Sequence, residues 1–280
     1  MDAVYIYRTS PFDDLEIRYS LRSIAKFAPY IHKVWIFGDK PDFISDNCSV
    51  IQHVPHEYTA RILRVETPVR NFGLLMVLAS LIPELSFEYL QFSDDHILLK
   101  DYPIEMARRT RFHCDMVMET PPPTREIGYW KRTLWHTVDT LLRLGHNAFN
   151  FETHTPRRLT RKIVFEAYSE LREFFTEHRA FGLTGPTAIL NHAYSNELLD
   201  LTSLSEEGQF SGFWHAQPDY EEVCSQSEGK TFLNFDDKAF GNGIRRYLSE
   251  KFPEPSKYEK NEPAGSKFPE DVEDAFPLYA

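Results

Sequence analysis

Cysteine and net positive charge are both scarce in this 280-residue chain. Three dispersed cysteines, Cys48, Cys114 and Cys224, exclude a disulfide framework and a C-x-x-C metal site, and we expect them to be buried in a reducing compartment. The 31 Lys and Arg residues face 42 Asp and Glu residues, which gives a formal net charge of -11. This balance argues against a protein that holds nucleic acid mainly through its phosphates.

Long apolar runs are also missing, and no internal repeat is present. No window approaches the length of apolar sequence that spans a bilayer. The first residues carry neither the basic region nor the apolar stretch of a signal peptide. We therefore expect a cytoplasmic protein without a transmembrane segment, whose oligomeric state the sequence leaves open.

Aromatic residues are plentiful, and their pattern predicts an α/β fold. The chain contains 22 Phe and 14 Tyr, which favours a packed enzyme over a disordered scaffold. Strands and helices alternate in the first half, which is typical of a mostly parallel sheet covered by helices. The expected strands are residues 4–7, 33–37, 49–54 and 87–92, and the expected helices are 17–28, with a Ser10 cap and Pro11 at its first position, and 71–81.

Two adjacent carboxylates follow the last of these strands. Asp94 and Asp95 come directly after the apolar residues 87–92, at the carboxyl end of a buried strand. Open α/β sheets bind ligands at that edge. Paired carboxylates there suit Mg²⁺ or Mn²⁺ bound to a diphosphate. The alternative is a solvated turn, in which Asp is common.

The second half of the chain is richer in helices. A proline-rich segment at 120–124 precedes helical patterns, and a last strand at 230–234 ends near Asp236 and Asp237. We expect one catalytic domain over residues 1–258, with a nucleotide-sugar half at 1–120, a helix-rich insertion on the acceptor side at 121–200, a return to the core at 201–258, and an extended or mobile tail at 259–280. The expected helices of this half are 127–144, 160–175, 186–195 and 238–251.

Several motifs in order resemble the Stealth proteins, which include bacterial capsular polysaccharide phosphotransferases. The resemblance covers residues 2–7 with 16–36, the Ser-Asp-Asp at 93–95, the His-Thr-Pro at 154–156, and residues 233–237 with 252–259. The first block departs from the family, because residues 6–9 read Ile-Tyr-Arg-Thr where the family has Thr-Trp-Val-Asp-Gly. An acid expected near the nucleotide is therefore missing. The family's Pro-Thr-Phe-Asn-Ser stretch keeps only Pro68 and Asn71.

The resemblance implies a GT-A-like, Rossmann-like core that binds a nucleotide sugar. Stealth members transfer a sugar-1-phosphate from a UDP-sugar to an acceptor hydroxyl in polysaccharide or glycoconjugate synthesis, and they release UMP. On this basis Mg²⁺ or Mn²⁺ would be held by Asp94, Asp95 and Asp236. His154 would take the acceptor proton, assisted by Arg158 as a phosphate ligand, and the substrate-binding residues would be Arg18, Arg22, Asn71 and Asn234.

Several alternatives stay open at the level of sequence. A GT-A glycosyltransferase would form a plain glycosidic bond and release a nucleoside diphosphate, and its acceptor could be a saccharide or a nucleic-acid base. A glycosidase would need a second acid, such as Glu152, across the bond from the pair. A binding module could retain the fold without the chemistry. For single residues, Arg18 and Arg22 could form a solvated stripe, and His53, His56 and His154 could simply be exposed.

Overall fold

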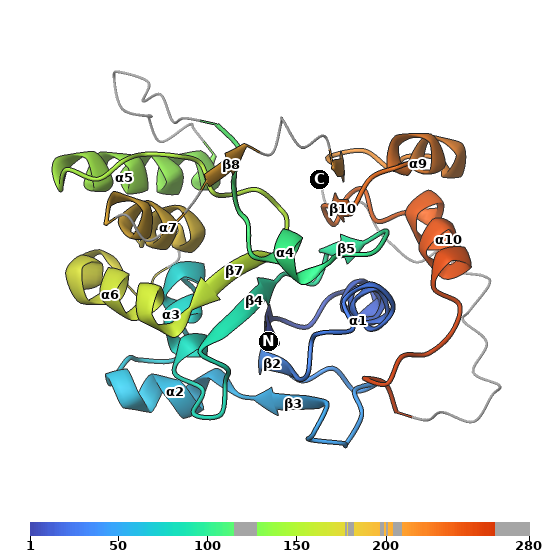
Figure 1. Cartoon of the computed structure of the whole chain (residues 1–280), viewed down its shortest axis with the longest axis horizontal. Coiled ribbons are helices and arrows are strands. Elements are labelled where there is room, and N and C mark those ends of the chain that lie inside the picture. The colour runs from blue at the N-terminus through green and yellow to red at the C-terminus, as the bar shows by residue number, and fades with distance from the viewer. Residues whose placement is uncertain are drawn as a thin grey trace.

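A five-stranded sheet in the order β3-β2-β1-β4-β7 forms the centre of the molecule (Figure 1). β1 (Asp2–Tyr7), β2 (Val34–Gly38), β3 (Ile51–Val54) and β4 (Glu88–Phe92) run parallel, and β7 (Arg157–Thr160) pairs antiparallel with β4. The computed structural model describes residues 1–114, 128–176, 178, 182–196, 199, 201–203 and 209–260.

Both faces of this sheet are covered, because alternate residues of each strand enter different cores. In β1, Ala3 and Tyr5 point towards α1 (Leu15–Phe27), whereas Val4 packs on the opposite face. The apolar runs of β1 and β2 are typical of a parallel sheet that is buried on both sides. The result is three layers, with helix, sheet and helix stacked in turn.

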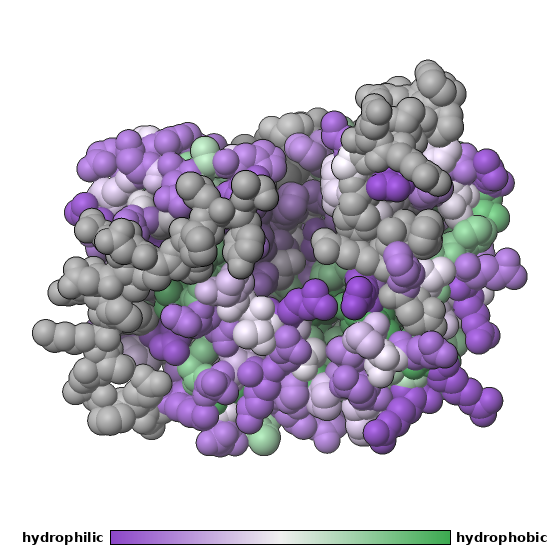
Figure 2. Space-filling view, turned by 180° about the vertical axis from the view of Figure 1, so that it is seen from behind, coloured by the Kyte–Doolittle hydropathy of each residue, from purple (hydrophilic) through white to green (hydrophobic). Residues whose placement is uncertain are grey.

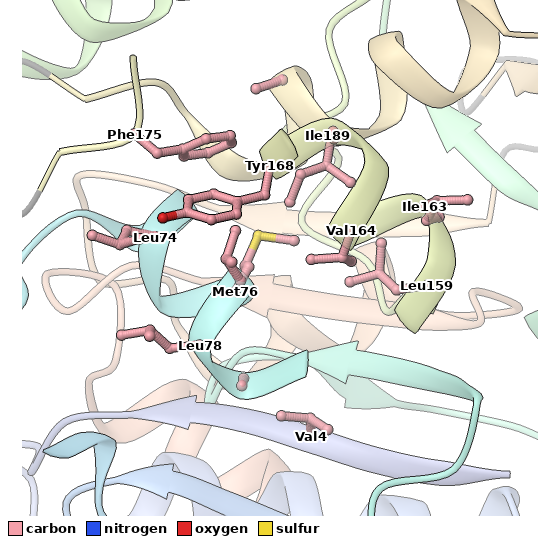
Figure 3. Packing of buried hydrophobic residues seen from close by; sticks show 14 of the residues in the cluster. Val4, Leu74, Met76, Leu78, Leu159, Ile163, Val164, Tyr168, Phe175 and Ile189 are labelled. Atoms are coloured by element: carbon pink, nitrogen blue, oxygen red, sulfur yellow. The ribbon is translucent and has the colours of Figure 1, made fainter. Parts of the chain in front are cut away.

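Within the described residues, the helical layer opposite α1 is built from five helices, and one of them, α3, contacts β1 of the sheet. Met76 of α3 and Val164 and Tyr168 of α6 meet in one apolar cluster beneath Ile189 of α7 (Figure 3). Leu74 and Phe175 close the same cluster at the edge. The five helices are α2 (His56–Leu63), α3 (Phe72–Ser80), α5 (Tyr129–Arg143), α6 (Arg161–Leu171) and α7 (Gly185–Ser195).

A second, smaller sheet extends the molecule beyond α1. Its order is β5-β10-β9, with β10 parallel to β9 and antiparallel to β5, and two helices pack on it (Figure 1). These elements are β5 (Ile97–Leu98), β9 (Phe210–Phe213), β10 (Phe232–Phe235), α9 (Tyr220–Ser227) and α10 (Asn242–Lys251). The remaining short elements are α4 (Ile104–Ala107), β6 (Thr110–Phe112), η1 (Arg172–Phe174) and β8 (Leu201–Ser203).

The structure confirms the predicted α/β class, with its mostly parallel central sheet and flanking helices. The first predicted helix starts late: residues 11–14 form a turn, Asp14 has a φ of 57°, and α1 begins at Leu15. The sequence reading missed α2 and β7, because both are short and rich in polar residues. Glu259 is buried and pairs with the body of the protein, so it does not begin a mobile tail; residues 261–280 lie outside the described part.

The predicted burial of the cysteines is wrong. Cys48 and Cys114 are exposed and Cys224 is half-buried, because all three lie in loops or on an outer helix face. Hydrophilic residues cover most of the face seen from behind, with small hydrophobic patches among them (Figure 2). Across the described ranges, no helix is long and apolar enough to cross a membrane.

Candidate functional site

The carboxyl ends of β1 and β4 lie side by side at the point where the strand order reverses. From β1 the sheet continues to β2 and β3 in one direction and to β4 in the other. The register pairs Tyr5 of β1 with Phe92 of β4, so the segments that leave these strands diverge from neighbouring positions. Doubly wound sheets form their ligand crevice at such a switch point. Asp94 and Asp95 are therefore at the edge where ligands bind.

A tight turn after β4 fixes the two aspartates. Its ends are joined by a hydrogen bond of 3.1 Å from the His96 amide to the Ser93 carbonyl. Ser20 of α1 donates to the His96 carbonyl at 2.5 Å and anchors the turn to the helix. Burial raises the pKa of Asp94 to about 6, and hydrogen bonds from backbone amides oppose this shift only in part. Burial, and then repulsion from Asp94, also raises the pKa of Asp95 well above its usual range.

Three further acids from other parts of the chain belong to the same crevice. Asp237 and Asp14 both raise the pKa of Asp94 through their negative charge. Burial raises the pKa of Glu16 to about 7, with a further contribution from Asp94. We call Asp14, Glu16, Asp94, Asp95 and Asp237 the acidic crevice.

Side chains at the end of β1 orient two of these acids. The Tyr7 hydroxyl donates to a carboxylate oxygen of Asp14, and the Ser10 hydroxyl donates to Glu16 at 2.5 Å. Asp14 and Glu16 were not predicted as site residues. Their position, Asp14 in the turn after a buried strand and Glu16 at the start of the following helix, was the available signal, and this segment was interpreted only as a helix start. They place two acids close to the carboxyl end of β1.

Asn234 of β10 reaches the same turn from the smaller sheet. Its amide nitrogen donates to the Asp95 carbonyl at 3.1 Å, and its side chain is fully buried. Its amide oxygen accepts no hydrogen bond within the described ranges. A buried acceptor without a donor is costly, and a bound cation would satisfy it. The structure thus brings Asn234, which the sequence suggested as a substrate-binding residue, next to Asp94 and Asp95, which it suggested as metal ligands; these roles stay predictions.

The acidic crevice is not neutralised by salt bridges. Of the residues that the structure describes, no Lys, Arg or His forms one with Glu16, Asp94, Asp95 or Asp237. Arg245 is near enough to lower the pKa of Glu16 slightly, against the larger effect of burial. Within the same described part, no group of three or more His, Cys, Asp or Glu side chains could hold a metal ion by itself. Any cation here would need oxygen atoms from Asn234 and from a substrate.

A large pocket opens beside the acidic crevice, at the carboxyl ends of β1 and β2. Its volume is about 910 Å³, which lies within the range of small-molecule sites. Tyr7, Arg8, Gly38 and Asp39 line it at the strand ends, and residues of α2 and α3 line its other side. Tyr7 connects the two features, because it lines the pocket and its hydroxyl donates to Asp14 of the acidic crevice. We call this cavity the strand-end pocket.

His154 lies on the other flank of the aspartates. It precedes β7, whose first residue pairs with Gln91 near the end of β4. The ring is accessible to solvent and stands 4.7 Å from the ring of Trp214, centroid to centroid. Surrounding protein atoms, and then the charge of Arg157, lower the pKa of His154 to about 4. Its imidazole is therefore neutral at neutral pH.

Arg157, and not the predicted Arg158, faces this region. Arg157 is buried and donates to the Gln91 amide oxygen at 2.9 Å. Burial lowers the pKa of its guanidinium, and the negative charges of Glu152 and Asp95 oppose this shift in part. Arg158 points to the opposite face of the sheet and binds Glu88 at 2.5 Å. Successive side chains of a strand alternate between faces, which accounts for the difference. The sequence pattern of the basic cluster could not show which arginine faced inwards.

Arg22 and Arg18 also have partners away from the acidic crevice. The Arg22 guanidinium is buried and binds both carboxylate oxygens of Glu259 at 2.8 Å, and it also donates to the Phe252 carbonyl at 2.9 Å. Arg18 approaches Glu259 at 3.8 Å and lies over the ring of Phe43. Both side chains hold the C-terminal segment against α1. This geometry argues against the predicted phosphate contacts.

Asp236 and Asn71 have structural partners as well. One carboxylate oxygen of Asp236 caps the turn at Ala239 (2.9 Å), and the other accepts from the His215 amide at 2.9 Å. Asn71 caps α3 by accepting from the Leu74 amide at 2.8 Å, and it donates to a carbonyl in the α6–α7 connection. Asp237 therefore replaces Asp236 as the acid that faces the crevice. Asn71 positions a helix instead of a ligand.

Together these features define an α/β protein with a group of buried, mutually repelling carboxylates at the switch point of its sheet. No family model matches the chain, and no curated protein matches it. Solved structures with a similar arrangement include the galactosyltransferase LgtC in complex with donor and acceptor sugar analogues, at 12% identity and a TM-score of 0.48, with 92% of this chain and 98% of that chain covered. Another is mouse xyloside xylosyltransferase 1 in its apo form, at 13% identity and a TM-score of 0.42, covering 86% and 97%. At this level of similarity the neighbours carry no information on what this chain binds.

Proposed function

We propose that the chain is a glycosyltransferase-type enzyme that uses a nucleotide sugar as donor and a hydroxyl group as acceptor. The observation that carries the proposal is that the strand-end pocket adjoins the acidic crevice through Tyr7, which lines the pocket and donates a hydrogen bond to Asp14. A nucleotide sugar has the same composition: a nucleoside at one end, a charged diphosphate in the middle, and a sugar beyond it. The pocket and the crevice match the first two parts in order.

The nucleoside would occupy the strand-end pocket. Asp39 stands at the end of β2, where doubly wound proteins use an acid to bind ribose hydroxyls. Its carboxylate already accepts from the amide and hydroxyl of Thr9, at 2.9 and 3.1 Å, which fixes its orientation. Arg8 lines the same pocket and is exposed, so its guanidinium is available to the phosphate that joins the nucleoside.

Mg²⁺ or Mn²⁺ would be held by Asp94, Asp95 and the amide oxygen of Asn234. Hard oxygen donors of this kind suit both ions, which usually complete their coordination with water and substrate phosphates. The buried, unpartnered oxygen of Asn234 and the lack of salt bridges within the described part of the crevice support this assignment. The ion would supply charge neutralisation to the diphosphate as the bond to the sugar breaks.

His154 would act on the acceptor. Its imidazole is neutral at neutral pH, so it can accept the proton of an acceptor hydroxyl while that oxygen bonds to the sugar. The bond between the sugar and the leaving phosphate breaks, and the proton stays on His154. Arg157 lies nearby and offsets part of the negative charge of the crevice. Its neighbour Arg158, bound to Glu88, would take no part.

Product analysis tests the proposal. The protein is incubated with a panel of UDP-sugars and Mn²⁺, with and without saccharide acceptors, and the released nucleotide is identified. UDP indicates transfer of the sugar, as in glycosyltransferases, whereas UMP indicates transfer of the sugar-1-phosphate, which the Stealth resemblance implies. Binding of the donor without turnover would favour a binding module, and neither binding nor turnover of any nucleotide sugar would refute the proposal.

A further inference from the structure

We infer that Trp214 forms a stacking platform for the ring of a saccharide acceptor, an inference that rests on the proposed function. Trp214 follows β9 at the carboxyl edge of the smaller sheet and is 38% exposed. Surface aromatic side chains bind sugars by covering the apolar C–H face of a pyranose ring. The argument for this role depends on how rigidly Trp214 is held, on its neighbours, and on which side of the aspartates it lies.

The Trp214 ring is supported from within the protein. The ring of Phe210 lies nearly parallel to it, with centroids 6.5 Å apart and an angle of 26° between the planes. Gly212 makes this arrangement possible, because a Cβ there would lie 3.0 Å from the indole and 2.8 Å from the ring of Phe210. A side chain at position 212 would displace one of the two rings. The platform is therefore built into the strand and does not depend on an induced fit.

The segment that carries Trp214 is also anchored at its other side. The next residue, His215, has a φ of 69° and donates its backbone amide to Asp236 at 2.9 Å, with its imidazole 3.2 Å from the same oxygen. The register of β9 and β10 pairs Phe213 with Phe235. Asp236, which the sequence suggested as a metal ligand, instead fixes the loop behind the platform.

Trp214 contacts the residue proposed to take the acceptor proton. The rings of His154 and Trp214 are 4.7 Å apart at an angle of 52°, so a sugar stacked on the indole would have hydroxyl groups beside the imidazole. His154 has a φ of 51°, a left-handed backbone conformation that residues other than glycine adopt uncommonly. His154 precedes β7 of the central sheet and Trp214 follows β9 of the smaller sheet, so their contact joins the two sheets at this point.

The location of Trp214 favours the acceptor over the donor. The strand-end pocket lies at the ends of β1 and β2, whereas His154 and Trp214 lie beyond β4, beside β7 and β9. Asp95 stands between them, because its carbonyl accepts from Asn234 of β10, the strand next to β9. The transferred sugar must lie between nucleotide and acceptor. A platform on the far side of the aspartates from the pocket is therefore on the acceptor side.

Local charge favours a neutral saccharide over a nucleic-acid base as the stacked ring. Asp236 and Asp237 follow the adjacent strand, and the acidic crevice begins next to them. A nucleic acid would bring phosphates into this negative environment, which opposes its binding. An uncharged sugar ring carries no such penalty.

Saccharide binding measured without nucleotide tests the platform directly. A panel of uncharged disaccharides is titrated against the protein, and saturation-transfer NMR reports which sugar protons contact it. We expect Trp214→Ala to weaken binding about tenfold and Trp214→Phe, which keeps an aromatic face, to retain most of it. Phe165→Ala, which removes an aromatic side chain 59% exposed on α6, should bind like the wild type.

The outcomes separate this inference from the function on which it rests. Wild-type binding in Trp214→Ala, or consumption of a UDP-sugar by a protein that binds no saccharide of the panel, would overturn the platform and leave the donor chemistry intact. Saccharide binding through Trp214 by a protein that binds no nucleotide sugar would support the platform and refute the proposed function. Among active variants, Trp214→Ala should raise the acceptor KM more than it lowers kcat.

Discussion

Helix α1 carries a buried arginine and a buried glutamate, and among the residues that the structure describes only the arginine forms a salt bridge. Towards its C-terminus, Arg22 is paired with both oxygens of Glu259, and the remaining guanidinium donor binds a carbonyl. Near its N-terminus, Glu16 is buried beside Asp94 and makes no salt bridge with a described residue. Less than two turns of helix separate a satisfied charge from an unsatisfied one.

This difference distinguishes residues that stabilise the fold from residues that await a ligand. A buried ion pair with good geometry compensates for the loss of hydration, so it needs nothing from outside. Carboxylates that repel one another have raised pKa values, and such groups concentrate at functional sites. The paired end therefore explains how the chain holds together, and the unpaired end indicates where it acts.

The sharpest test of the unpaired end is Asp95→Asn. Removing one carboxylate from the crevice should lower turnover of a UDP-sugar by about 10³-fold, because an electrostatic group aimed at the reacting phosphates is lost. The fold should survive, since the substitution removes a repelled charge and keeps the shape. Steady-state kinetics measure the loss. The matched control is Asp46→Asn on the exposed β2–β3 loop, and equal activity of the two variants would refute the assignment.

The paired end predicts a loss of stability. Arg22→Met leaves the Glu259 carboxylate buried without its partner, which should lower the free energy of unfolding by about 3–5 kcal/mol. Urea denaturation measures this change, and turnover per folded molecule should stay close to that of the wild type. The double variant with Glu259→Leu should recover much of the loss. Arg18→Met, which removes a weaker contact of 3.8 Å, is the control.

The pH dependence of stability should reveal the crevice acids. Asp94 and Glu16 have folded pKa values of about 6 and 7, above their ordinary values of 3.8 and 4.5. Because these pKa values are raised, the folded state binds more protons between about pH 4 and 7, so both groups lose their stabilising effect as pH rises through that window. The melting temperature in EDTA is compared for the wild type and Glu16→Gln at each pH.

The Glu16→Gln variant has no ionisable group at position 16. The melting temperature of the wild type should therefore fall relative to that of the variant as pH rises from 5 to 8. Mn²⁺ should raise the melting temperature of the wild type most at the upper end of this range, where the carboxylates are ionised. A wild type that gains stability relative to Glu16→Gln over the same range would contradict the raised pKa.

The smallest expected effect concerns the paired arginine on β7. Arg158 and Glu88 are both partly exposed, so Arg158→Ala should cost only about 1 kcal/mol or less and leave turnover per folded molecule unchanged. Arg157→Ala should cost more, because it removes a buried guanidinium bound to Gln91 and adjacent to Asp95. Denaturation and kinetics on both variants decide which arginine belongs to the crevice.

The sequence was sufficient for most of the central fold. Apolar runs identified β1, β2 and β4, since a parallel sheet buried on both faces leaves a largely hydrophobic signal, whereas the edge strand β3 has two polar residues at its centre. Asn71 marked the start of α3, because its side chain caps the helix. The strand β7 gave no such signal. Its residues Arg-Arg-Leu-Thr become a strand only through pairing with β4, a tertiary effect that periodicity does not contain.

Only the site residues that follow or occupy a clear strand could be predicted from the sequence. Asp94 and Asp95 follow a clear strand, and Asn234 occupies the last apolar strand, so their positions followed from the fold class. The sequence could not show which of two adjacent residues faces the site. Arg157 or Arg158, and Asp236 or Asp237, differ in which way one side chain points, and strand alternation and turn capping decide that.

The pairing of Arg22 with Glu259 also bears on how the chain matures during synthesis. The two partners are 237 residues apart in the sequence. During synthesis α1 can form early, but the Arg22 guanidinium has no partner until the ribosome has added Glu259, almost 240 residues later. A chain truncated before Glu259 would leave the Arg22 guanidinium unpaired in the middle of α1.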